Sequence, residues 1–103
     1  LGGRLDRDDV CDAHPELLRA GRHIGSPAPT PCPVCGRHNL RLVSYVYGDA
    51  LARANGRCIT SPNELDRLDA THEEFTRYVV EVCLDCSWNH LQRHELHGRR
   101  HVG

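Results

Sequence analysis

Two C-x-x-C pairs constrain this chain more strongly than any other feature of its sequence; they comprise Cys32, Cys35, Cys83 and Cys86. Two thiolates separated by two residues can bind one tetrahedral ion from a tight turn, and two such pairs supply the closed four-thiolate set of a structural zinc site. Gly36 directly after the first pair permits the backbone conformation that points amide groups at the sulfurs, whereas Ser87 occupies the matching place in the second pair. We therefore predict one structural zinc ion on these four cysteines, with no open position for a substrate.

The small size of the chain favours stabilisation by disulfides or by a structural metal ion. Its 103 residues predict one domain with a marginal core, and they include one Trp, one Phe, three Tyr and no Met. Six cysteines could form three disulfides in a secreted protein, but no apolar run has signal-peptide or membrane-spanning character. We therefore expect a cytoplasmic protein without membrane contact, and the alternative that the pairs are redox-active dithiols stays open.

The segment between the two pairs, residues 36–82, is longer than the roughly 15–20 residues of common four-cysteine zinc sites. Alternating side chains predict strands over 39–47 and 75–83, which would bring the pairs together whatever is inserted between them. A capping box opens a short helix predicted near 61–70. A third strand is expected over 87–91.

The N-terminal segment, residues 1–25, is predicted to be helical. Residues 7–13 suggest one short helix, and Pro15 suits the first turn of a second helix. Gly21 or Gly25 would end that second helix.

These elements predict a small α+β protein. Its centre is a three-stranded antiparallel zinc ribbon over residues 32–92, with N-terminal helices and the short helical insertion. A stiff, proline-rich connector over 26–31 leads into the ribbon, and a His/Arg-rich tail over 93–103 follows it.

The remaining cysteines and histidines allow weaker hypotheses. Cys11 and His14 have C-x-x-H spacing and could supply half of a second metal site, together with Cys58 or His23. The simpler interpretation is that Cys11 is a buried thiol. The tail histidines would line one face of a helix, but Gly98 interrupts it, so a solvated tail is the simpler expectation.

The charge is close to neutral overall, at −1, but it is unevenly distributed. Residues 17–48 contain four arginines and no acidic residue, which favours contact with phosphate or carboxylate groups. The balance is not that of an obligate nucleic-acid binder, and GC-rich coding would give the same arginine bias. The candidate binding residues are Arg19, Arg22, Arg37, His38, Arg41, Arg93, Arg99 and Arg100.

Five segments carry a family resemblance: residues 10–20, 31–35, 45–49, 78–83 and 88–91, with the sequences VCDAHPELLRA, PCPVC, YVYGD, YVVEVC and WNHL. Together they resemble a family of short actinobacterial proteins of unknown function, over roughly residues 3–91. The resemblance implies a cytoplasmic zinc-ribbon-like protein and supplies no established activity. Ser87, Cys58 and the tail after Gln92 depart from the family pattern.

Three classes of function follow. We predict a non-enzymatic binding module that docks on the transcription or translation machinery, or on nucleic acid, through its arginine-rich face; this rests on analogy with other zinc ribbons. The expected partner is a protein or a ribonucleoprotein. The alternative is a thiol-based redox or zinc-responsive regulator. The sequence has no convincing carboxylate pair, no nucleophile with a base and no phosphate-binding glycine loop, so we predict neither an enzyme nor a small-molecule substrate.

Overall fold

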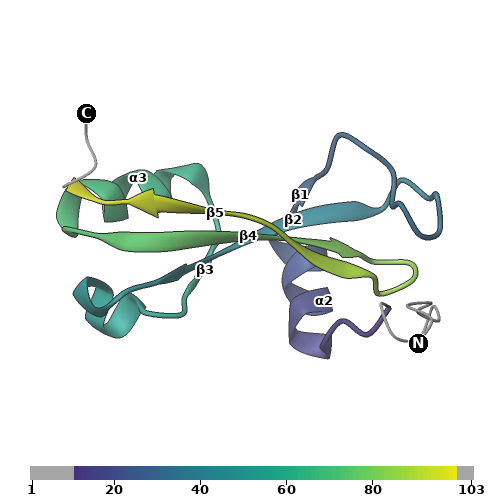
Figure 1. Ribbon diagram of the computed structural model, residues 1–103, viewed down its shortest axis with the longest axis horizontal. Coiled ribbons are helices and arrows are strands. Elements are labelled where there is room, and N and C mark those ends of the chain that lie inside the picture. Colours follow the sequence, from purple (N-terminus) through teal and green to yellow (C-terminus); the bar gives the residue numbers. More distant parts are fainter. Residues whose placement is uncertain (1–10, 100–103) are drawn as a thin grey trace, which may run out of the picture.

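A long, twisted antiparallel sheet forms the body of the molecule (Figure 1). The computed structural model describes residues 11–99. The five strands are β1 (Ser26–Pro27), β2 (Leu40–Tyr47), β3 (Cys58–Ile59), β4 (Phe75–Cys83) and β5 (Asn89–His97). Their order across the sheet is β1-β2-β4-β5, and β3 also pairs with β2.

The central pair of strands places the two cysteine turns side by side. In the antiparallel register, Leu40 of β2 lies opposite Cys83 of β4, and Tyr47 lies opposite Thr76. The first turn therefore enters β2 at the same end of the sheet at which the second turn leaves β4. These two strands match the predicted ones closely, because alternation along a half-buried strand is a local signal.

The opposite end of the sheet carries an ordinary hydrophobic core. It is covered by helix α3 (Pro62–Thr71) and by the 3-10 helix η1 (Asp49–Ala54). The buried side chains are those of Val46, Leu51, Ala54, Ile59, Leu68 and Phe75. We call this region the α3 end, and the region with the cysteine turns the cysteine end.

The capping signal predicted for α3 is present. The Ser61 Oγ accepts the N–H of Glu64 at 3.3 Å, and the Glu64 carboxylate accepts the N–H of Thr60 at 2.8 Å. The side chain of Glu64 thus reaches one residue further back than in a standard capping box. The helix predicted near 61–70 is confirmed.

Helix α2 (Pro15–His23) packs near the cysteine end, on the face of the sheet that carries Arg41 and Val82. Alternation along the strands puts Val46 and Phe75 on the other face. A Cβ atom on Gly21 would lie 2.8 Å from Cγ1 of Val82, so glycine allows the close approach. Gly21 therefore serves packing and does not end the helix.

Several sequence predictions need correction. The sheet has five strands and not three, because residues 26–27 of the predicted connector and residues 58–59 each pair with β2. The third predicted strand begins at Asn89 and extends to His97, so residues 93–97 of the predicted tail belong to the sheet. Residues 11–13 are not helical. The rest of the predicted first helix and residues 100–103 lie outside the described residues.

No helix within residues 11–99 has both the length and the apolar character needed to cross a bilayer.

Candidate metal centre

The four cysteines predicted as ligands converge at the cysteine end. The sulfur atoms of Cys32, Cys35, Cys83 and Cys86 all lie within 4.8 Å of one another. The Sγ atoms of Cys32 and Cys86 are 3.7 Å apart, and those of Cys35 and Cys83 are 3.6 Å apart. Zinc–sulfur bonds of about 2.3 Å give a tetrahedron with edges of about 3.8 Å. The four sulfurs therefore fit one tetrahedral thiophilic ion.

The two cysteine turns, residues 32–36 and 83–87, share one backbone design. The N–H of Gly36 donates to the carbonyl of Cys32 at 2.9 Å, and the N–H of Ser87 donates to the carbonyl of Cys83 at 3.0 Å. Both closing residues have positive φ, +76° for Gly36 and +68° for Ser87. The second turn therefore uses a serine in a conformation that favours glycine.

Burial and backbone contacts shape the chemistry of the thiols. Cys32 and Cys83 are 2% and 0% exposed, whereas Cys35 and Cys86 are half-buried. Burial raises the pKa of Cys83 to about 12, so a thiolate at neutral pH there needs a cation beside it. The backbone N–H of Arg37 holds the pKa of Cys35 below its usual value. Buried, converging sulfurs of this kind suit a metal ion.

The centre is apolar on one side and open on the other. Ala28, Val34 and Trp88 pack against the buried cysteines, and the Trp88 ring stacks on His90 at a centroid distance of 5.7 Å. A cavity of about 290 Å³ lies on the open side. It is lined by Val34, Cys35, Arg37, Asp85 and Cys86. Solvent therefore reaches the half-buried pair of cysteines and not the buried pair.

A fifth thiol touches this centre, which the sequence did not predict. The Sγ of Cys11 lies 3.6 Å from the Sγ of Cys86. The N–H of Ala13 donates to the carbonyl of Ser87 at 3.0 Å, which holds the N-terminal segment against the second turn. No sequence signal could have placed Cys11 here, because the contact joins segments 75 residues apart.

The other two weakly predicted ligands lie elsewhere. The Nδ1 of His14 accepts the N–H of Glu16 at 3.0 Å and caps helix α2. Cys58 lies opposite Tyr45 in the sheet, and burial raises the pKa of its thiol to about 11. Within residues 11–99, the four-cysteine set is the only cluster of three or more side chains that could bind a metal ion. Among these residues, the structure therefore brings no third ligand to the second site predicted on Cys11 and His14.

The predicted binding residues separate into two groups. Arg19 and Arg22 on α2, and Arg37 and His38 after the first turn, are exposed at the cysteine end. Arg41 lies beneath α2, since its Cβ would be 3.1 Å from a side chain at Gly25. Arg19 pairs with Glu16 at 3.0 Å. Among the described residues, Arg22, Arg37 and Arg41 make no ion pair.

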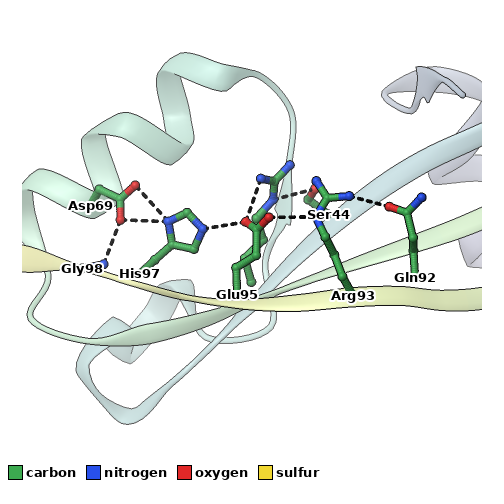
Figure 2. A network of polar contacts seen from close by, with 8 residues as sticks. Ser44, Asp69, Gln92, Arg93, Glu95, His97 and Gly98 are labelled. Carbon is green, nitrogen blue, oxygen red and sulfur yellow. Dashed lines mark hydrogen bonds and ion pairs between the residues drawn. The ribbon is translucent and has the colours of Figure 1, made fainter. Parts of the chain in front are cut away.

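Arg93 belongs to an internal network instead (Figure 2). Its Nε donates to Glu95 at 2.7 Å, and Arg77 reaches the same carboxylate at 3.1 Å. His97 joins Glu95 at 2.9 Å to Asp69 of α3 at 3.0 Å. The network ties β5 to α3 and leaves Arg93 engaged by its own chain.

Arg99 lies at the α3 end, where its N–H donates to the carbonyl of His72 at 2.9 Å. Figure 1 shows the C-terminal end of β5 beside α3, at the end of the sheet opposite the cysteine turns. Arg99 therefore does not join the arginines around the first turn, because β5 runs away from them. Arg100 lies outside the described residues.

Comparison with known proteins gives the chain a family. Residues 1–102 match a family described as a family of unknown function (DUF5318). The chain belongs to this family. The resemblance inferred from the sequence is thereby confirmed.

The chain is also similar to uncharacterised mycobacterial proteins. The chain is 46% identical over 89 residues to "Uncharacterized protein Rv0049" of Mycobacterium tuberculosis and to "Uncharacterized protein Mb0050" of Mycobacterium bovis. The alignment covers 86% of this chain and 64% of each relative, so the chain spans just under two thirds of their length. No solved structure matches the chain.

Proposed function

We propose that this chain is a non-enzymatic zinc-ribbon module whose single structural zinc ion supports a docking surface for nucleic acid or for a ribonucleoprotein of the transcription or translation machinery. The observation that carries the proposal is the closed set of four sulfurs, all within 4.8 Å of one another. When protein sulfur fills every position of a tetrahedral ion, no position remains for a substrate. The ion then has a structural role, and the function lies on the surface that it supports.

The surface best suited to a phosphate-bearing partner lies at the cysteine end. Arg22 and Arg37 are exposed there, and neither makes an ion pair within residues 11–99. The stretch from residue 17 to residue 48 contains no Asp or Glu. A guanidinium group binds phosphate oxygens through two parallel hydrogen bonds. The acidic residues of the α3 end would then face away from the partner.

The metal part of the proposal is tested by elemental analysis of protein purified without added metal, combined with a count of reactive thiols. We expect one zinc ion per chain, with the thiols of Cys11 and Cys58 outside the metal set. A protein that holds no divalent ion and melts unchanged in the presence of a chelator would rule out the structural zinc site.

The partner part is tested by fluorescence anisotropy with a labelled single-stranded RNA over a salt series. We expect the Arg22→Gln/Arg37→Gln double variant to bind more weakly, with a salt slope reduced by about 2. The matched control is Arg53→Gln/Arg67→Gln, which removes two exposed arginines from the α3 end. If the two double variants behave alike, or if the RNA does not bind, the nucleic-acid version is rejected.

A thiol-based redox or zinc-responsive regulator is the second candidate. It is favoured by the cavity that opens onto Cys35 and Cys86, because oxidants reach sulfur through solvent. Zinc release by low peroxide, reversed by a thiol reductant, would separate this function from a purely structural site.

A further inference from the structure

We propose that Cys11 is the disulfide partner of Cys86: a hydroperoxide oxidises Cys86, and Cys11 then closes a disulfide that removes Cys86 from the metal. The inference rests on the proposed metal centre and adds a redox response to it. Its basis is the contact between a thiol that is surplus to a tetrahedral ion and one of the four ligand sulfurs.

The geometry of this contact suits a disulfide. The two Sγ atoms are 3.6 Å apart, and a disulfide bond of about 2.05 Å requires them to approach by only about 1.5 Å. Two contacts hold the N-terminal segment in place. One is the backbone bond from Ala13 to Ser87 at 3.0 Å, and the other is the bond from the Asn89 amide to Asp12 at 3.0 Å. Both contacts hold the residues directly after Cys11 against the segment that follows the second turn, so the Cys11 sulfur already lies beside Cys86 before any oxidation.

Cys86 is one of the two ligand cysteines that an oxidant can reach from solvent. The cavity of about 290 Å³ opens onto Cys35 and Cys86. Cys32 and Cys83 are 2% and 0% exposed, so the protein shields them. Cys35 shares the cavity, but its sulfur contact at 3.6 Å is with Cys83, which is itself a ligand.

Cys11 is the disulfide partner because its thiol touches Cys86 and is not needed as a metal ligand. A tetrahedral ion takes four sulfurs, and Cys32, Cys35 and Cys83 stay on the ion when Cys86 is oxidised. Cys11 is the thiol in contact with Cys86 that the ion does not need. The other surplus thiol, Cys58, lies in β3 opposite Tyr45 and is held away from the centre by strand pairing.

The reaction balances with one equivalent of hydroperoxide. The Cys86 thiolate attacks the O–O bond, which forms the sulfenic acid of Cys86 and releases hydroxide. The Cys11 thiol then attacks that sulfur, the S–S bond forms, and the S–O bond breaks with release of water. Formation of the disulfide oxidises each sulfur by one electron. The two electrons reduce the two oxygens of the peroxide. The ion is left with three sulfur ligands.

Loss of one ligand weakens metal binding, and a reductant restores it. Zinc affinity depends on the full set of thiolates, so the three-sulfur centre releases zinc to a competing chelator. Reduction of the Cys11–Cys86 disulfide returns both thiols and rebuilds the four-sulfur set. Without Cys11, the sulfur left in contact with Cys86 is that of Cys32 at 3.7 Å, which is itself a ligand. Oxidised Cys86 then has no surplus thiol as a partner and proceeds to sulfinic acid, which reductants do not reverse.

The experiment treats the zinc-loaded chain with hydrogen peroxide and follows zinc release with a metal-sensitive dye. Peptide mapping under non-reducing conditions then identifies the linked cysteines. We expect a Cys11–Cys86 linkage in the wild-type chain and in the control Cys58→Ser. In Cys11→Ser, we expect no such linkage, oxygen added at Cys86, and no recovery of zinc binding after reduction.

Two results would overturn the proposal. One is a wild-type linkage confined to the four ligands, such as Cys32–Cys86 or Cys35–Cys83. The other is full recovery of zinc binding by Cys11→Ser after reduction. Mapping of the wild-type chain needs no variant, so it decides the matter even if Cys11→Ser folds poorly. The zinc content before oxidation is a separate readout: a metal-free chain contradicts the proposed metal centre, whereas a zinc-loaded chain with a different linkage contradicts only the role of Cys11.

Discussion

The two ends of this molecule solve the same stability problem in different ways. The α3 end buries a cluster that includes Val46, Leu51 and Phe75 beneath α3 and η1. The fully buried residues of the corresponding cluster at the cysteine end are Cys32, Leu40 and Cys83, and two of these three are proposed metal ligands. A metal ion can therefore take the place of a hydrophobic core where the chain has too few large apolar side chains to build two.

The difference also predicts how each end fails. Full burial of a large apolar side chain contributes about 1.5–3 kcal/mol, so the α3 end is stabilised by many moderate contributions. A structural zinc site contributes on the order of 10 kcal/mol in one step. The cysteine end should respond to chelators and ligand substitutions, and the α3 end to cavities in its core.

The largest effect is expected from Cys83→Ser. Cys83 is 0% exposed and joins the centre of the sheet to the four-sulfur set. Its loss should remove most of the zinc-binding free energy, on the order of 10 kcal/mol, and unfold the cysteine end. Zinc content and thermal melting by circular dichroism provide the measurement, with Cys58→Ser as the control outside the set. A soluble Cys83→Ser chain with an unchanged melting temperature would show that the two ends do not differ as described.

A cavity at the opposite end should leave the metal in place. Phe75 is 2% exposed in the core of the α3 end, and Phe75→Ala should lower the free energy of unfolding by about 3–5 kcal/mol. Zinc stoichiometry under native conditions should stay at the wild-type value. Urea denaturation measures the first quantity and elemental analysis the second. Loss of zinc from folded Phe75→Ala would mean that the two ends are coupled more tightly than their separate clusters suggest.

The network that ties β5 to α3 should make the α3 end sensitive to acid. The hydrogen bond from His97, followed by that from Arg93, lowers the pKa of Glu95 from 4.5 to about 2. Because the folded-state pKa is the lower one, this carboxylate stabilises the fold above about pH 4.5, and the contribution is lost as the pH falls toward 2.

The measurement is the difference in unfolding free energy between the wild type and Glu95→Gln over that pH range. The difference should shrink as the pH falls, while zinc release in acid affects both proteins alike. A difference that stays constant between pH 6 and pH 2 would show that the network does not stabilise the fold.

The smallest effect on stability is expected from substitutions at the closing residues of the two cysteine turns, Ser87 and Gly36. Ser87 has φ of +68°, so Ser87→Gly should raise the stability of the zinc-loaded chain by about 0.5–1 kcal/mol. Gly36→Ala is the mirror test, because φ there is +76° and an added Cβ meets no atom within 4 Å. Gly36→Ala should lower the free energy of unfolding by about 1 kcal/mol through backbone strain alone. Melting temperatures of the two variants should shift in opposite directions, and shifts in the same direction would contradict the shared design of the turns.

Local signals in the sequence determined the framework of this protein. Strands β2 and β4 follow from alternation, α3 from its Ser61 cap, and the cluster of four sulfurs from the two C-x-x-C pairs. Each of these depends on neighbouring residues, or on one pairing that the cysteines themselves require. Glycine preference also marked Ser87 as the unusual residue of its turn, and its positive φ agrees.

Tertiary structure alone decided what surrounds that framework. The short strands β1 and β3 form because β2 offers them unpaired backbone groups, and the extension of β5 follows its register with β4. The same register carries Arg99 away from the cysteine turns. The contact of Cys11 with Cys86 depends on how the N-terminal segment docks against a turn that lies 75 residues away in the sequence. Such contacts arise from register and packing between distant segments, and residue spacing within one segment contains no information about them.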